Sequence, residues 1–197
     1  MCIRDRARGL QQALLVVDMP FLSYQTSCYD ALYNAGRLVK EGGANAVKLE
    51  GGQAVCPQIA AISQAGVPVM AHLGLTPQAV NALGGYKVQG KTQASAQQLL
   101  DDALAVQQAG AFALLLECVP APLAQRITEK LTIPTIGIGA GAGCDGQILV
   151  YQDLLAMSQG HTPKFVKQYA DLGQAMTAAF QAYDQEVKAG AFPDRCV

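Results

Sequence analysis

Short apolar runs alternate with longer amphipathic stretches along most of this chain. The pattern is clearest in three similar segments, residues 43–50, 64–72 and 108–117, where a glycine precedes an apolar run that closes on an ionisable residue. Apolar residues at helical spacing come before each glycine, over Tyr29–Lys40, Val55–Gln64 and Ala96–Gln108. A glycine just past a helix supplies the left-handed residue that ends it. The short apolar run behind it is typical of a buried parallel strand.

Extended along the chain, this pattern predicts about six strand–helix units. The expected strands are Leu14–Asp18, Ala46–Glu50, Pro68–His72, Phe112–Glu117, Pro134–Ile138 and Gln147–Tyr151. The tail predicts one more amphipathic helix, Gln174–Ala189. Alternating strands and helices favour a parallel α/β sheet, open or closed. A closed barrel of eight such units usually takes about 250 residues, so we expect either an open sheet or a barrel without its first two units.

Two connections between the predicted elements are unusual. Leu75–Thr92 is much longer than the roughly 2–6 residues that normally join a strand to the next helix, and long loops in compact domains are usually lids or binding loops. We expect this segment to cover the mouth of a site. The glycine-rich segment Gly137–Gly143 fits either a phosphate cradle or a tight turn, and the Lys-Ser/Thr of a P-loop does not follow it.

The composition agrees with a densely packed protein. Hydrophobic residues make up 51% of the 197 residues and charged residues 15%, against a usual ~25% charged. High apolar content with a net charge of −1 excludes a disordered chain. It points to strands buried on both faces, to a subunit interface, or to both.

Charge and apolar run lengths also exclude several partners. The chain has no Lys/Arg-rich stripe, so we expect no nucleic acid partner. The longest apolar run, Ala111–Leu116, is far shorter than the ~20 residues that span a bilayer, and Ala13–Val17 is too short for the core of a signal peptide. The six cysteines are scattered, as is typical of reduced thiols. We therefore expect a cytoplasmic protein without a membrane partner.

Ionisable residues occur where the predicted strands end. Four of the strands close on such a residue: Asp18, Glu50, His72 and Glu117. Lys48 lies two residues before Glu50 and therefore on the same strand face. The carboxyl ends of parallel barrel strands meet at one mouth, where active sites are built. The sequence therefore predicts a site at this end of the sheet.

Each of these residues has both a chemical and a structural interpretation. Two carboxylates aimed at one point can hold Mg²⁺, which prefers oxygen ligands, but Asp18 can also cap a turn and Glu50 can pair with Lys48. Lys48 fits that ion pair about as well as a clamp on a substrate carboxylate. A lone histidine such as His72 is more often structural than a ligand. Burial of Glu117 suits a general base or acid, and a carboxylate bonded to backbone is the alternative.

Seven motifs, in order along the chain, resemble the ketopantoate hydroxymethyltransferase family. They are Val17–Phe21, Val47–Gly52, His72–Gln78, Gly84–Gly90, Leu116–Pro120, Ile136–Gly141 and Asp145–Gln147. The resemblance implies a (β/α)₈ TIM barrel, here incomplete, with about six units that correspond to strands 3–8 and a C-terminal helix. It also implies a homo-oligomer, typically a decamer.

The resemblance implies an activity and roles for the candidate residues. Members of the family transfer a one-carbon unit from 5,10-methylenetetrahydrofolate to 3-methyl-2-oxobutanoate, which gives 2-dehydropantoate for pantothenate and coenzyme A synthesis. By motif, Asp18 and Glu50 correspond to Mg²⁺ ligands, and Asp18 and Lys48 to contacts with the keto acid. Glu117 corresponds to the catalytic proton acceptor. His72 matches a histidine at the substrate-binding mouth.

The chain also departs from the family pattern. The family's Gly-Asp-Ser motif, which brings a further metal-site Asp and a substrate-binding Ser, does not occur here. Residues 1–12 are expected to be a foreign or disordered leader, and residues 13–197 one partial barrel domain. Two alternatives to the transferase therefore stay open. One is a non-catalytic barrel fragment, and the other is a related Mg²⁺-dependent lyase acting on keto acids.

Overall fold

The computed structural model describes residues 3–158, 160 and 162–194. It divides into two compact units, residues 1–148 and 149–197, each of which is described by itself. The first unit holds a parallel sheet with its helices and the second holds two helices. The candidate residues from Asp18 to Glu117 all lie in the first unit.

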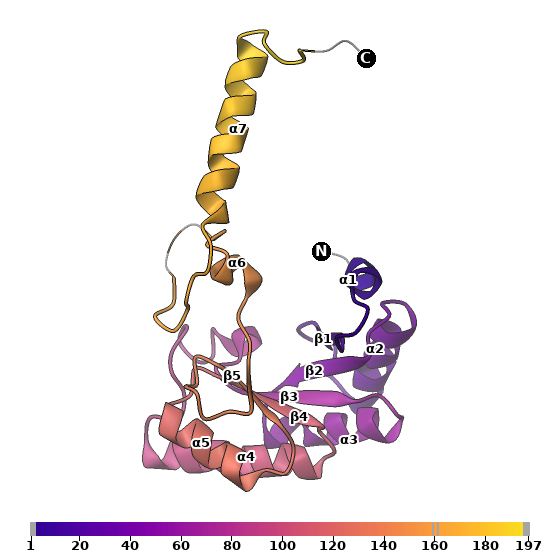
Figure 1. The fold of residues 1–197 in the computed structure, drawn as a ribbon. Coiled ribbons are helices and arrows are strands. Elements are labelled where there is room, and N and C mark those ends of the chain that lie inside the picture. Colours follow the sequence, from indigo (N-terminus) through magenta and orange to yellow (C-terminus); the bar gives the residue numbers. More distant parts are fainter. Residues whose placement is uncertain (1–2, 159, 161, 195–197) are drawn as a thin grey trace. The chain divides into compact units, whose positions relative to one another are not determined.

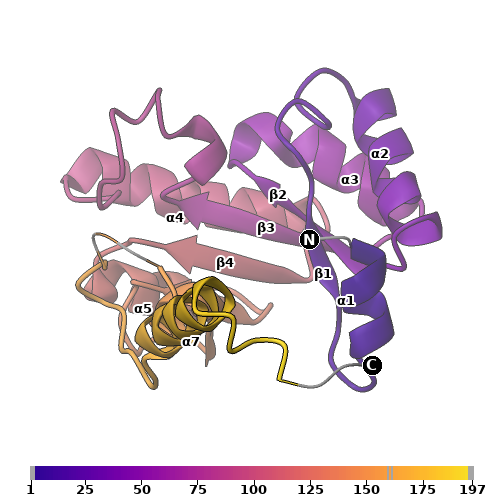
Figure 2. The same cartoon turned by 90° about the horizontal axis from the view of Figure 1, so that it is seen from above.

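A six-stranded parallel sheet forms the centre of the first unit, and its strands follow one another in sequence order. The strands are β1 (Val16–Asp18), β2 (Ala46–Glu50), β3 (Val69–Gly74), β4 (Ala113–Glu117), β5 (Thr135–Ile138) and β6 (Gly146–Gln147). The sheet curls into part of a barrel (Figures 1 and 2). The predicted fold class, a partial TIM barrel, is confirmed.

Helices cover one face of this sheet. They are α2 (Cys28–Lys40), α3 (Cys56–Gln64), α4 (Gln93–Gln108) and α5 (Ala121–Lys130), with short 3₁₀ turns η1 (Gln53–Val55) and η2 (Pro77–Ala79). Alternate strand residues such as Leu49, Leu114 and Leu116 point to this side and form the hydrophobic core with Ile59 and Ile127, all of them fully buried. The apolar face of the strands and the apolar faces of the helices therefore pack against each other in one buried layer.

The opposite, concave face carries the chemistry. In the register of the sheet, Asp18 lies beside Lys48, Glu50 beside His72, and Gly74 beside Glu117. Because successive side chains of a strand alternate between faces, Lys48 and Glu50 share the concave face. The fold therefore brings the predicted strand-end residues to one edge of the sheet.

Local sequence signals account for the helix ends. Ser27 accepts a hydrogen bond from the amide of Asp30 at 3.0 Å and caps α2, as a serine does at a helix start. Thr92 and Ser95 form a capping box at the start of α4. Gly43, past the end of α2, has a φ of 75°, which agrees with the left-handed glycine expected there.

Two stretches of the first unit differ from the expected pattern. The predicted strand Gln147–Tyr151 is wrong beyond Gln147, because β6 pairs with β5 at only two positions and Tyr151 begins a helix. Part of the predicted leader, residues 1–12, forms helix α1 (Ile3–Gly9), whose Arg4 donates to the carbonyl of Glu41 at 2.7 Å. The domain boundaries given from the sequence stay predictions.

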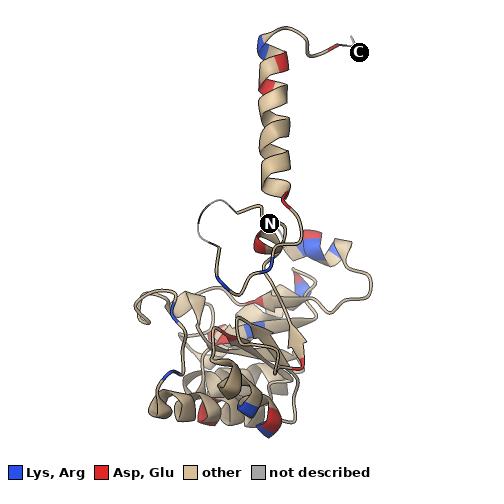
Figure 3. Cartoon of the chain, turned by 60° about the vertical axis from the view of Figure 1, so that its left-hand side comes forward, with Lys and Arg blue, Asp and Glu red and all other residues tan. Residues whose placement is uncertain are grey.

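The second unit contains α6 (Tyr151–Leu154) and α7 (Leu172–Lys188). The expected tail helix is therefore present, and Asp171 caps it by accepting from the amide of Gln174 at 3.2 Å. Its charged residues gather near its carboxyl end (Figure 3), where Lys188 pairs with Asp184 at 2.7 Å. Within the described part of the chain, we find no helix with the length and apolar character to cross a membrane.

Candidate active site

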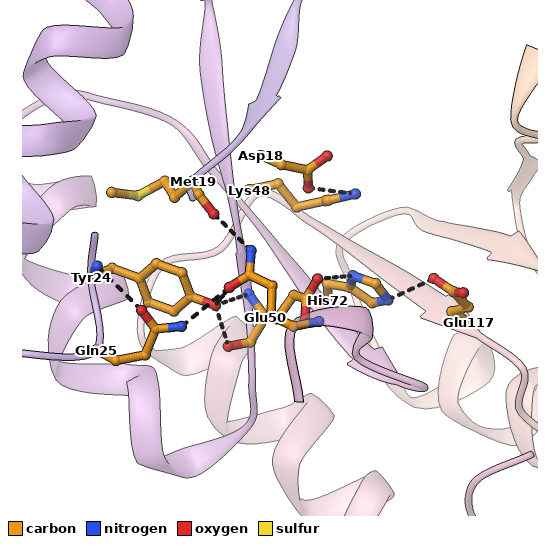
Figure 4. Close-up of polar contacts among 9 residues, drawn as sticks. Asp18, Met19, Tyr24, Gln25, Lys48, Glu50, His72 and Glu117 are labelled. Atoms are coloured by element: carbon orange, nitrogen blue, oxygen red, sulfur yellow. Dashed lines mark hydrogen bonds and ion pairs between the residues drawn. The ribbon is translucent and has the colours of Figure 1, made fainter. Parts of the chain in front are cut away.

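Three side chains from adjacent strands meet at the carboxyl end of the sheet. β2, β3 and β4 present Glu50, His72 and Glu117 in a row (Figure 4). His72 Nε2 lies 3.2 Å from Glu117 Oε2, and His72 Nδ1 lies 3.9 Å from Glu50 Oε1. The histidine side chain is 2% exposed, and the glutamates 10% and 18%. The structure thus places a buried imidazole between two nearly buried carboxylates.

The geometry around His72 leaves its polar atoms incompletely satisfied. Neither ring nitrogen has a hydrogen bond of normal geometry within the described residues, although Nε2 is close to Glu117. Buried polar atoms are nearly always hydrogen-bonded, and exceptions tend to mark functional sites. The arrangement favours a histidine that interacts with a bound polar ligand or orients Glu117 over one that only supports the core.

Lys48 and Asp18 form an ion pair beside this row. Lys48 Nζ lies 2.7 Å from Asp18 Oδ1, with the lysine side chain 15% exposed and the aspartate 62% exposed. The structural partner of Lys48 is therefore Asp18 rather than Glu50, which was the alternative from the sequence. This pair puts a positive charge at the rim, within the reach of a small anionic substrate.

Glu50 lies in an unfavourable environment for a negative charge. Burial raises the pKa of its carboxyl group, and the charge of Asp18 adds to this effect. The amide of Gln78, His72 and Lys48 act in the opposite direction and lower the pKa. The net result is a raised pKa, so a cation bound between Glu50 and Asp18 would relieve the cost of ionising Glu50.

Two further residues, Tyr24 and Gln78, contact Glu50 and were not found from the sequence. Tyr24 is fully buried, and its hydroxyl lies 3.1 Å from both the amide and the carbonyl of Glu50. The amide of Gln78 donates to Glu50 Oε2 at 2.9 Å. Neither residue ends a predicted strand. Gln78 does lie within the long segment Leu75–Thr92 and is the last residue of the motif His72–Gln78.

A pocket of about 640 Å³ opens beside Glu50. Its walls come from the loops after β1, β2 and β3, and include Phe21, Gln25, Gly51, Thr76 and Asn81. The long segment after β3 is attached near the site at both ends, because Leu75 donates to the carbonyl of Glu117 at 2.7 Å and Gln89 donates to that of Cys118 at 2.9 Å. That this segment covers the mouth stays a prediction.

Packing accounts for one of the residues in the glycine-rich connection. Gly141 has a φ of 79°, and a side chain there would collide with Ala121 of α5. The sequence left two interpretations of this segment, a phosphate cradle or a tight turn. The tight turn explains this glycine.

Sequence comparison decides the family. A family model described as ketopantoate hydroxymethyltransferase matches residues 2–195. The chain belongs to this family. It is 61% identical over 192 residues to 3-methyl-2-oxobutanoate hydroxymethyltransferase of Clostridium novyi (strain NT), covering 98% of this chain and 70% of that protein. It is 62% identical over 190 residues to the protein of the same name from Enterococcus faecalis (strain ATCC 700802 / V583), covering 96% and 69%.

Solved structures support the fold. A phosphonomutase-like protein from Burkholderia cenocepacia J2315 superposes with a TM-score of 0.55 over 93% of this chain and 75% of that one. Sequence identity is only 16%, so this likeness speaks for the barrel architecture and not for the reaction.

Membership of the ketopantoate hydroxymethyltransferase family gives the site residues their expected roles, which remain predictions. For Mg²⁺, the described residues contain no group of three or more His, Cys, Asp or Glu side chains arranged to hold a metal ion. Asp18 and Glu50 therefore offer two carboxylates, and Mg²⁺ commonly binds one or two carboxylates with water and substrate oxygens completing its shell. The pKa of Glu50 is raised although the amide of Gln78, His72 and Lys48 lower it, so a bound cation would further stabilise the ionised carboxylate. The residues present fit this cation.

Proposed function

We propose that this chain catalyses the reaction for which its relatives are named. In it, 3-methyl-2-oxobutanoate, 5,10-methylenetetrahydrofolate and one water yield 2-dehydropantoate and tetrahydrofolate. The observation that carries the proposal is the row Glu50–His72–Glu117, in which His72 Nε2 lies 3.2 Å from Glu117 Oε2. This row supports the proposal because Glu117, the candidate base, and Glu50, a candidate ligand of a divalent cation, both contact His72.

The substrate-binding end of the site uses charge. Asp18 and Glu50 would hold Mg²⁺, which supplies Lewis acidity toward the oxygens of a bound keto acid. Lys48, 2.7 Å from Asp18, would carry its positive charge toward the substrate carboxylate and orient it. The positive charge of Lys48 would interact with the carboxylate of the keto acid and more strongly with the dianionic enolate, so part of its effect would act on the developing charge.

Glu117 would do the proton transfer. Its carboxylate takes the proton from C3 of the keto acid, and the electron pair left behind is shared with the keto oxygen. C3 then bonds to the one-carbon unit of the folate, and both carbon–nitrogen bonds of that unit break. Water supplies the hydroxyl group, and the two folate nitrogens take one proton from water and one from Glu117. His72, which lies between Glu50 and Glu117 with Nε2 3.2 Å from Glu117 Oε2, would orient the Glu117 carboxylate. The pocket beside Glu50 offers space for the second substrate.

Hydrogen–deuterium exchange tests the base directly. In D₂O with Mg²⁺ and without folate, the C3 proton signal of 3-methyl-2-oxobutanoate should disappear in the presence of the unchanged chain. The Glu117→Gln variant should exchange about a thousandfold more slowly, because a positioned base contributes about 10²–10⁴. Glu129→Gln, an exposed change on α5, is the matched control. Absence of exchange with the unchanged chain, or equal rates with Glu117→Gln, would reject the proposal.

A further inference from the structure

Three loops far apart in the sequence meet in one hydrogen-bonded cluster at the strand ends. Met19 and Tyr24 come from the connection after β1, Glu50 ends β2, and Gln78 lies in η2 after β3. Tyr24 and Gln78 are 54 residues apart and their side chains lie 2.9 Å from one another. Figure 4 shows Tyr24 on the side of Glu50 away from Glu117. The cluster therefore joins the ends of three adjacent strands.

The Tyr24 hydroxyl uses its hydrogen-bonding capacity on this cluster. It accepts from the amide of Glu50 at 3.1 Å, and its single proton is directed to Gln78 Oε1 at 2.9 Å or to the carbonyl of Glu50 at 3.1 Å. Burial raises the pKa of Tyr24 to about 12, so the hydroxyl keeps its proton at neutral pH. The tyrosine thus fixes the backbone of Glu50 rather than its carboxylate.

Gln78 contacts the remaining parts of the cluster. Its Nε2 donates to the carbonyl of Met19 at 2.8 Å, and its Oε1 accepts from Tyr24 and from Gln25 Nε2, the latter at 3.2 Å. Its backbone amide donates to Glu50 Oε2 at 2.9 Å. Because both the oxygen and the nitrogen of the Gln78 side-chain amide are hydrogen-bonded, the orientation of that amide is determined. One residue therefore holds both the carboxylate of Glu50 and the residue that follows Asp18.

Like charge makes such a connection necessary. Asp18 and Glu50 are both acidic and lie on one face of adjacent strands. The amide of Met19 donates to the carbonyl of Lys48 at 2.9 Å, and Lys48 Nζ lies 2.7 Å from Asp18 Oδ1, but neither contact involves the side chain of Glu50. We infer that Tyr24 and Gln78 are positioning residues that hold Asp18 and Glu50 at the separation one divalent cation needs. The inference rests on the proposed function.

Two variants that keep side-chain volume test it. Tyr24→Phe removes one hydroxyl, and Gln78→Met removes the amide but leaves the backbone donor to Glu50. Residues that orient metal ligands typically change metal affinity by 10–100-fold when mutated, so we expect the Kd for Mg²⁺, measured by calorimetry without substrate, to rise at least about tenfold in both. Amide hydrogen exchange at Glu50 should become faster in Tyr24→Phe, because the amide loses its acceptor.

The control separates positioning from general loss of stability. Ile59→Val trims a fully buried, apolar side chain of α3 that has no polar atom to take part in the hydrogen-bonded cluster, and it should leave the Kd for Mg²⁺ unchanged. Equal Kd values in the unchanged chain and the two variants, or an equal rise in Ile59→Val, would overturn the inference. If the unchanged chain binds no Mg²⁺, the cation of the proposed function fails and the inference fails with it. The two failures are therefore distinguishable.

Discussion

Ionisation of Glu50 would favour binding of a cation but has an unfavourable effect on folding. Its side chain is 10% exposed, and burial together with Asp18 raises its pKa above the ordinary value of 4.5. A group whose pKa is higher in the folded state than in the unfolded state stabilises the fold at low pH, and that contribution is lost as the pH rises through the folded-state pKa. At neutral pH an ionised Glu50 therefore lowers the free energy of unfolding. Groups with this effect are commonly kept for function.

Removing that charge should stabilise the chain when no metal is present. We expect Glu50→Gln to have a higher Tm than the unchanged chain at pH 7.5 in a chelator, because the neutral amide avoids the desolvation of a carboxylate. The difference should shrink as the pH is lowered toward 4.5. Thermal melts across this range provide the measurement. A lower Tm for Glu50→Gln at pH 7.5 would contradict the electrostatic description.

Leu22 has a left-handed backbone and should gain from losing its side chain. Its φ is 64° and it is 58% exposed, so a glycine there relieves steric strain and gives up little packing. We expect Leu22→Gly to raise the free energy of unfolding by about 1 kcal/mol. Leu14, 57% exposed with an ordinary φ, is the matched position, where the same change should lower it by about 0.5–1 kcal/mol. Urea denaturation measures both, and a destabilised Leu22→Gly would be inconsistent with strain.

At the scale of elements, buried strands were the most predictable. β2 has the predicted bounds, Ala46–Glu50, because an apolar run between a helix-ending glycine and an ionisable residue has few other solutions. The start of α4 at Gln93 instead of the predicted Ala96 reflects the capping box, which was not recognised. β6 was predicted too long. Its sequence resembles that of a longer strand, but only two of its positions pair with β5.

Only the site residues that lie at the ends of strands could be predicted from the sequence. Strand ends converge in any parallel sheet, so Glu50, His72 and Glu117 could be grouped from the sequence, and the structure brings them together. Tyr24 and Gln78 could not be found this way. Their contacts join loops distant in sequence, and neither hydrophobic period nor turn chemistry encodes which loops meet.

The two faces of the sheet should differ in their contribution to stability. Leu116 of β4 is fully buried against the helices, whereas Ile136 of β5 is half-buried and lines the concave face. We expect Leu116→Ala to lower the free energy of unfolding by about 3 kcal/mol and Ile136→Ala by about 1 kcal/mol, since the cost follows burial and cavity size. Denaturant titration checks the ranking. Equal losses would mean that the concave face is also packed.

At the scale of the whole molecule, the first unit leaves sheet surface available for contact. Among the described residues, β1 and β6 each pair with a single strand. A cavity of about 570 Å³ on the concave face is lined mostly by apolar side chains, including Val16, Met70, Leu115 and Ile136. Unpaired strand edges and apolar patches promote association. These surfaces give a physical reason to expect that this chain associates.

Association should therefore depend on concentration and on the edge strand β1. In sedimentation velocity, we expect the unchanged chain to shift to larger species as its concentration rises. Val16→Lys places a charge on the edge and on the concave face, so it should need about tenfold more protein for the same shift, equivalent to about 1.4 kcal/mol. Tyr29→Lys, on a residue of α2 that is 75% exposed, adds the same charge away from the sheet. If Tyr29→Lys suppresses association equally, net charge rather than the open sheet controls association. If the unchanged chain stays monomeric at every concentration, neither net charge nor the open sheet drives association.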